Sequence, residues 1–323
     1  MKKSALLTVC FLGLTALMLL YSKESTYFAL TGLQLWFSKM IPALMPFMAL
    51  SGLMIRLELT ENLGAIFTPL LGKLYRVSKT SVYCIIMGFF CGFPMGARVV
   101  GELYGRGKLT RQEAQFLLCF CNNIGPIYFV SFALPTMGMT SHTAICLFGM
   151  YGIPLLYGLF LRWTVYRKSL SPRENKFTPD SILSPKEKQT FLKHLEDALW
   201  ASIHGITGLG GYMILFNLCN LIPEVLAQEL HLSPGINRLL LPLLNALLEI
   251  TGGLSRLGSD RPILALILLS FGGLSCMAQT YSMICHTDLS LGSYFKNKLC
   301  LTAITTLYYL FLQFSGILMA GFS

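Results

Sequence analysis

The sequence predicts an all-α polytopic membrane protein, built as an inverted repeat with two re-entrant helical hairpins and two discontinuous transmembrane helices. The first observation is composition: 54% of the 323 residues are hydrophobic and only 12% are charged, against roughly 25% charged in an average soluble domain. The second is the pair of interrupted apolar stretches GFPMGAR at 92–98 and CNNIGP at 121–126. Within a bilayer, such irregular backbone must be buried in protein or line a cavity. Both stretches therefore predict a binding site.

Charge and cysteine content exclude several other classes of protein. The net charge of +10 is expected to mark cytoplasmic loops, and no nucleic-acid partner is predicted. The ten cysteines lie mostly in apolar runs without zinc-site spacing, so we expect core residues and no metal. The motifs GxSxG, HExxH and Walker A are absent from the sequence, which argues against an enzyme.

Residues 1–26 are predicted to form an uncleaved transmembrane helix with its N-terminus in the cytoplasm. Two lysines precede an apolar run, as in a signal peptide, but no small-x-small cleavage site follows. We expect this helix to stand outside the repeats.

Residues 27–163 are predicted to form the first repeat. The apolar segment 27–55 is expected to enter along the membrane surface and turn into a helix, and the short segment 62–75 is expected to lie at the interface. Lysine and arginine flank 80–104 on both sides, which predicts a hairpin with both ends in the cytoplasm. A discontinuous helix over 112–136 follows.

After a helix at 141–163, a basic cytoplasmic linker is predicted at 164–196. Residues 197–323 are predicted to form the second, inverted repeat. Its expected parts are an outward helix at 199–222, a hairpin at 237–258, a broken helix at 262–284 and a last helix at 299–322. Lys296 and Lys298 are expected to mark the cytoplasmic side.

The interruptions fall at matching positions of the two halves. The segment 92–98 lies opposite 248–254, and 121–126 lies opposite 272–277. Inverted repeats with paired interrupted segments are typical of secondary transporters, whose substrate site lies between the repeats near the bilayer midplane.

Five ordered blocks resemble the YlbJ, or SpoVV, family of sporulation integral membrane proteins. They lie at 92–98, 109–114, 120–126, 248–253 and 273–279, and the resemblance extends over roughly 35–310. It implies a nucleoside-recognition, or Gate, domain with an architecture similar to concentrative nucleoside transporters. It also implies transport of dipicolinic acid out of the mother cell, across the outer forespore membrane.

Arg98 is the first candidate for substrate binding. Its guanidinium is a permanently charged fork suited to a carboxylate, and dipicolinate is a rigid dicarboxylate. The alternative is that Arg98 only extends toward the cytoplasmic interface.

Polar side chains near the other interruptions complete the predicted site. Asn122 and Asn123 are expected to donate amide hydrogens beside the free backbone amides that follow Gly125, or else only to satisfy carbonyls freed by Pro126. Glu249 is expected to carry a proton, bind a cation, pair with Arg98, or lie at the outer rim. The full expected set is Arg98, Gly96, Asn122, Asn123, Gly125, Glu249, Thr251, Gly252, Ser275 and Gln279.

The preferred hypothesis is a multi-pass protein of the cell membrane that acts as a secondary transporter of a small carboxylate anion. One alternative is a non-transporting sporulation assembly protein that recruits partners through the linker, and another is a nucleoside-type transporter. No cofactor is expected apart from a coupling proton or sodium ion. The expected partners are the small-molecule anion and the lipid bilayer, and the family analogy permits a homo-oligomer.

Overall fold

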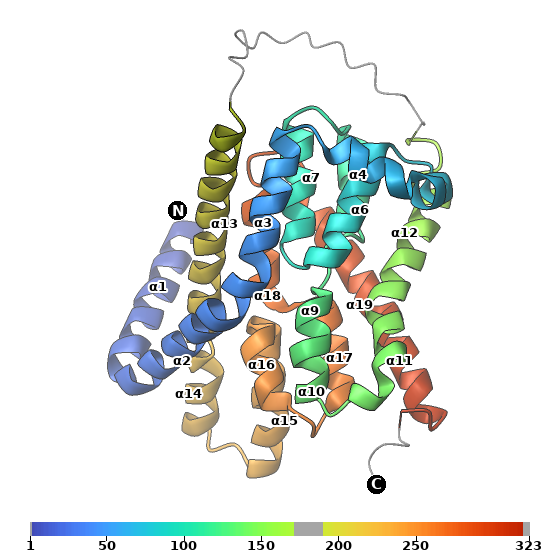
Figure 1. The fold of residues 1–323 in the computed structure, drawn as a ribbon. Coiled ribbons are helices and arrows are strands. Elements are labelled where there is room, and N and C mark those ends of the chain that lie inside the picture. The colour runs from blue at the N-terminus through green and yellow to red at the C-terminus, as the bar shows by residue number, and fades with distance from the viewer. Residues whose placement is uncertain (1, 171–189, 319–323) are drawn as a thin grey trace.

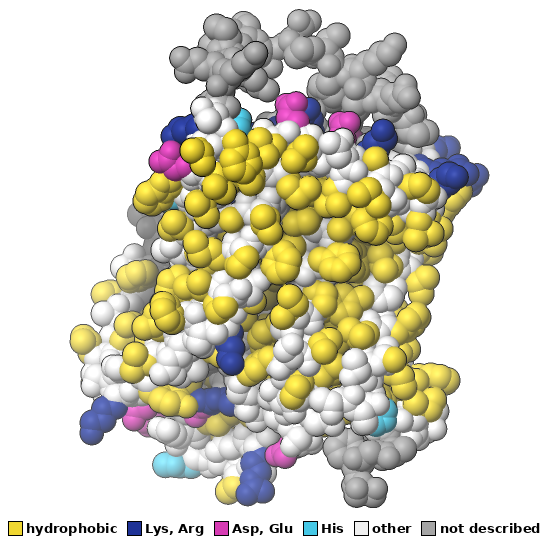
Figure 2. All heavy atoms as spheres, in the orientation of Figure 1, with side chains coloured by type: hydrophobic (Ala, Val, Ile, Leu, Met, Phe, Trp, Pro, Cys, Tyr) yellow, Lys and Arg dark blue, Asp and Glu magenta, His cyan; other side chains and the backbone are white. Residues whose placement is uncertain are grey.

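The computed structural model describes residues 2–170 and 190–318, and the regular secondary structure of these residues is entirely helical (Figure 1). Among them, four helical stretches are long and apolar enough to cross a membrane: Ser22–Arg56, Thr140–Trp163, Phe191–Glu229 and Pro262–Ile284. Hydrophobic side chains cover the middle of the face in Figure 2, whereas charged side chains gather at its two ends. The predicted all-α polytopic membrane class is confirmed. Most of the predicted linker at 164–196 lies outside the described residues.

The N-terminal helices form a hairpin beside the rest of the bundle. Helix α1 (Lys2–Leu20) is followed by a turn at Tyr21, and α2 (Ser22–Leu35) begins at the next residue, so the chain turns before the predicted boundary at residue 26. A π-helical turn joins α2 to α3 (Ile41–Arg56). The stretch from α2 to α3 is therefore one bent helix, and it packs along α13 (Phe191–Leu218).

The next helices form the first predicted hairpin. Helices α4 (Thr60–Phe67) and α5 (Lys73–Tyr75) cross one end of the molecule. Ser78 then caps α6 (Lys79–Cys91), and the chain reverses at 92–94 into α7 (Met95–Gly105). The reversal uses Gly92 with φ of +85°, a conformation that glycine adopts without a steric penalty.

The first broken helix consists of α8 (Arg111–Leu118), irregular backbone over 119–125, and then α9 (Pro126–Tyr128) and α10 (Leu134–Thr136). Thr110 and Glu113 form a capping box at its start. The return stretch contains α11 (Thr143–Leu147) and α12 (Ile153–Trp163). Three π-helical turns, at Trp36–Met40, Phe129–Ala133 and Phe148–Gly152, each end two residues before a proline. These wider turns relieve the clash between a proline ring and the preceding turn.

The second half has the same order of elements. Helices α13 (Phe191–Leu218) and α14 (Leu221–Glu229) lead to the hairpin of α15 (Pro234–Leu248) and α16 (Ile250–Leu257). The second broken helix is α17 (Pro262–Phe271) and α18 (Gly273–Ile284). In Figure 1 the α6–α7 and α15–α16 hairpins occupy opposite ends of the molecule, and their reversals both face its middle.

The last helix differs from its prediction. Helix α19 runs from Leu291 to Phe314 and is capped by the Ser290 hydroxyl, so it begins eight residues before the predicted start at 299. Lys298 therefore lies inside a helix, and it is only 3% exposed. The interpretation of Lys298 as a cytoplasmic marker is wrong, because its side chain faces the bundle.

Candidate functional site

Each hairpin tip packs against the interrupted segment of its own half. A side chain at Gly92 would overlap the backbone of Gly125, and a Cβ atom at Gly273 would lie 3.1 Å from the carbonyl oxygen of Ala246. The halves also meet, because a Cβ atom at Gly272 would lie 3.1 Å from the Phe93 ring. Missing side chains thus allow two tips and two helix breaks to converge on one place.

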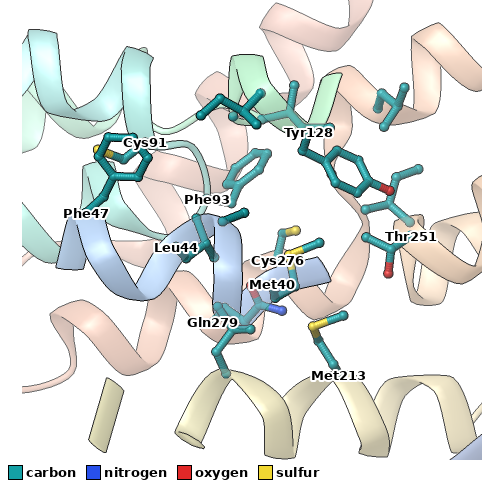
Figure 3. A pocket seen from close by; sticks show the side chains of 18 of the residues that line it. Met40, Leu44, Phe47, Cys91, Phe93, Tyr128, Met213, Thr251, Cys276 and Gln279 are labelled. Atoms are coloured by element: carbon teal, nitrogen blue, oxygen red, sulfur yellow. The ribbon is translucent and has the colours of Figure 1, made fainter. Parts of the chain in front are cut away.

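A cavity of about 60 Å³ lies at this convergence. That volume holds a few water molecules, so a larger ligand requires a wall to move outward. Figure 3 shows Tyr128 and Thr251 on one side and Phe47 and Cys91 on the other. The lining is mostly apolar and comes from both halves: Met40, Ala43, Leu44, Phe47, Phe90, Cys91, Phe93, Ile124, Gly125, Ile127, Tyr128, Leu209, Met213, Glu249, Ile250, Thr251, Leu269, Gly272, Cys276 and Gln279.

Glu249 is the acidic residue of this lining, at the reversal of the second hairpin, and it is 1% exposed. Its Oε2 atom accepts hydrogen bonds from Thr251 Oγ1 at 2.5 Å, the Gly252 amide at 2.7 Å and Asn217 Nδ2 at 3.3 Å. All three donors are neutral. Because no salt bridge of the described residues involves Glu249, its charge would have to be balanced by a proton, a cation or a ligand.

Three other polar groups belong to the same region. The Tyr128 hydroxyl is buried and has no hydrogen-bond partner among the described residues. Gln279 lines the cavity and donates from Nε2 to the Ser275 hydroxyl at 2.9 Å. Ser275 is fully buried behind Gln279, so it positions that amide and does not line the cavity.

Asn122 and Asn123 stabilise the first helix break from within. Asn122 accepts from the Ala97 amide at 3.4 Å and donates to the hydroxyls of Thr280 at 2.9 Å and Tyr294 at 3.1 Å. Asn123 donates to the carbonyl oxygen of Phe120 at 2.7 Å. Neither residue lines the central cavity in this conformation. The bond from Asn123 to a carbonyl oxygen of the interrupted segment is of the kind that the predicted alternative describes, whereas Asn122 bonds an amide and two hydroxyls of other helices.

The predicted glycines act through close packing. A side chain at Gly96 would overlap the Cys121 carbonyl oxygen, and one at Gly252 would lie 2.6 Å from Asn217 Oδ1. Gly125 lines the cavity itself. The structure therefore brings Gly125, Glu249, Thr251 and Gln279 to one cavity, while Gly96, Gly252 and Ser275 support its walls.

Arg98 lies away from this cavity. It is the fourth residue of α7, and its Nη1 atom approaches α13. A Cβ atom placed on Gly205 of α13 would lie 3.5 Å from this Nη1 atom and would also contact the side chain of Met48. Nη1 is buried and has no hydrogen-bond partner among the described residues. Arg98 is absent from the lining, and the predicted pairing with Glu249 is not among the salt bridges of the described residues.

Lys298 is the residue that the sequence interpretation missed. From α19 its Nζ atom donates to the Asn122 carbonyl oxygen and to Asn123 Oδ1, both at 3.2 Å. The spacing of Tyr294, Lys298 and Leu301 places them on one helix face, but only the structure shows that this face of α19 is the buried one. Within the described residues, no group of three or more histidine, cysteine, aspartate or glutamate side chains is arranged to hold a metal ion.

Comparison with curated proteins shows similarity to a sporulation protein. The chain is 26% identical over 317 residues to the sporulation integral membrane protein YlbJ of Bacillus subtilis (strain 168), covering 90% of this chain and 78% of that protein. This similarity confirms the predicted resemblance to the YlbJ family. No family model and no solved structure matches the chain.

Proposed function

We propose, from the similarity to the YlbJ family and from the geometry of the cavity, that the chain is a secondary transporter of a small aromatic carboxylate. Our preferred substrate is dipicolinic acid, moved from the mother cell toward the forespore across the outer forespore membrane. The observation that carries the proposal is the central cavity at which two hairpin tips and two helix breaks meet.

The lining suits a flat ring with polar substituents. Phe47, Phe90, Phe93 and Tyr128 supply aromatic surface, against which a planar ring packs by stacking or edge contact. Thr251, Gln279 and Tyr128 add groups that orient a polar ligand. A mostly apolar pocket with a few such groups is the usual form of a small-molecule site.

Movement of the hairpins gives access to this pocket in our proposal. Hairpins that enter from opposite ends allow the cavity to open to one side at a time, as in transporters built from inverted repeats. The α6–α7 tip opens toward the end where α4 lies, and the α15–α16 tip opens toward the other end (Figure 1). Glu249 lies in the second tip and carries the coupling proton, since its hydrogen-bond donors are all neutral.

One observation favours a second candidate, a nucleoside-type substrate. Among the described residues no lysine or arginine lines the cavity, and a neutral nucleoside needs hydrogen bonds without a fixed cation. Stacking on the aromatic walls and hydrogen bonds to Gln279 and Thr251 would serve such a ligand equally well.

Uptake into proteoliposomes tests the proposal. The full-length chain is reconstituted, and accumulation of labelled dipicolinate is compared with that of labelled uridine, with and without a proton gradient. We expect dipicolinate uptake that the gradient accelerates, and at least a tenfold loss in Glu249→Gln, or about 1.4 kcal/mol. Glu61→Gln, an exposed change on α4, is the matched control and should behave as wild type.

The alternatives give different results. Uridine uptake without dipicolinate uptake would favour the nucleoside-type transporter. If the folded protein accumulates neither compound, the transport proposal fails and the assembly role becomes the better explanation. Equal dipicolinate uptake by Glu249→Gln and wild type would refute only the proposed role of Glu249 and would leave the transport proposal standing.

A further inference from the structure

The buried ammonium of Lys298 has no carboxylate partner in the part of the chain that the structure describes. No salt bridge of the described residues involves Lys298, and its hydrogen-bond acceptors are a backbone carbonyl and an amide oxygen. A buried charge in the membrane interior is expensive and is usually paired or functional. The ammonium of Lys298 is therefore able to form an ion pair with a bound anion.

Lys298 is separated from the central cavity by one layer of side chains. Its Nζ atom lies 4.6 Å from the centre of the Phe93 ring, and Phe93 lines the cavity from the other side. A second, water-sized void of about 10 Å³ is lined by Lys298, Asn123, Ser270 and Thr305.

The two cavities share a wall. Ile124 and Leu269 line both of them, so a displacement of these side chains and of Phe93 joins the two spaces. The joined space would have a polar end with the ammonium and an aromatic, mostly apolar remainder. That division matches a carboxylate attached to a ring.

We propose that Lys298, and not Arg98, is the cation that pairs with a carboxylate of the transported anion, and that Phe93 is the side chain that turns aside to expose it. This inference rests on the proposed transport of a carboxylate and identifies the residue that selects for one. The face of the Phe93 ring stabilises the ammonium by a cation–π contact while the site is empty, and the carboxylate replaces this contact when it binds.

Lys298→Gln is the informative substitution. The glutamine amide keeps a donor for the Asn122 carbonyl oxygen or for Asn123 Oδ1 but removes the charge. We expect the KM for dipicolinate uptake to rise at least about tenfold. The affinity for the uncharged diamide of dipicolinic acid, measured by thermal shift, should change less than about twofold. Lys298→Arg keeps the charge and should retain discrimination between acid and diamide.

Two controls separate the possible outcomes. Lys296→Gln makes the same change on an exposed position of α19 and should match wild type. Arg98→Gln should leave dipicolinate uptake within about twofold of wild type, and this result does not depend on the folding of the Lys298 variants.

The inference fails if folded Lys298→Gln transports dipicolinate with an unchanged KM, or if Arg98→Gln abolishes uptake. In either case, uptake by wild type would leave the proposed function standing. Absence of carboxylate uptake by wild type would overturn the proposed function and this inference together.

Discussion

Gly96→Ala should destabilise the protein, because Gly96 touches backbone that cannot rotate away. A Cβ atom there would overlap the Cys121 carbonyl oxygen and lie 3.0 Å from the Cys121 carbonyl carbon and 3.1 Å from Asn122 Cα. Cys121 and Asn122 are 0% and 2% exposed, so α7 has to shift away from the break. This shift would also stretch the 3.4 Å hydrogen bond from the Ala97 amide to Asn122.

The expected magnitude follows from three opposing effects. Overpacking costs about 1–3 kcal/mol, and loss of the hydrogen bond costs about 0.5–1.5 kcal/mol. Alanine recovers about 0.5–1 kcal/mol because glycine is unfavourable in a helix. We therefore expect a net destabilisation of about 0.5–4 kcal/mol.

The buried cysteines provide the assay. Cys84, Cys91, Cys119 and Cys121 are buried around this contact, so a thiol-reactive fluorophore reports their exposure during thermal unfolding in detergent. Gly105→Ala is the matched control on the same helix, because a Cβ atom at Gly105 meets nothing within 4 Å. The reasoning is refuted if both variants melt together, at or above the temperature of wild type.

Two further predictions concern residues outside the cavity. Arg162 is 4% exposed and donates to the carbonyl oxygens of Tyr75, Tyr166, Arg167 and Leu170. Arg162→Met should therefore lower the unfolding free energy by about 2–4 kcal/mol, whereas Arg167→Met, at an exposed side chain, should leave it unchanged. Equal melting temperatures of the two variants would contradict this prediction. In the loop after α18, the hydrogen bond from Tyr104 and the charge of Arg111 lower the pKa of Asp288. Its contribution to stability should be present above the unfolded pKa of about 3.9 and be lost as pH falls through the lower folded pKa. Thermal unfolding of wild type and Asp288→Asn between pH 3 and 7 measures this contribution. The difference in stability between the two proteins should be small, because Asp288 is exposed, and it should be constant above pH 5. A difference in stability that grows on acidification would contradict the predicted pH dependence.

The helix interruptions could be located from the sequence because their causes are local. Gly92 and Gly272 have positive φ values, and Pro126 starts a new helix after irregular backbone. Backbone conformation of this kind depends on residue type more than on distant contacts. The predicted broken helices and chain reversals accordingly agree with the described helix bounds to within a few residues.

The direction in which each side chain points could not be predicted from the sequence in the same way. Arg98 lies four residues into a correctly predicted helix, yet it faces α13 and not the cavity. Rotation of a helix about its axis is decided by packing between segments that are distant in the sequence. Lys298 shows the same difficulty, since a lysine near a helix start suggests a loop until the burial of its neighbours is known.

The contact between Lys298 and the first helix break has a consequence for biogenesis. Lys298 and Asn123 are 175 positions apart, so the ribosome completes the first broken helix long before its ammonium donor has been synthesised. Until α19 enters the membrane, the carbonyl oxygen of Asn122 and Oδ1 of Asn123 lack this donor, in surroundings where unsatisfied polar groups are costly. A chain interrupted before residue 298 would thus carry a first half in which these two acceptors lack their lysine donor.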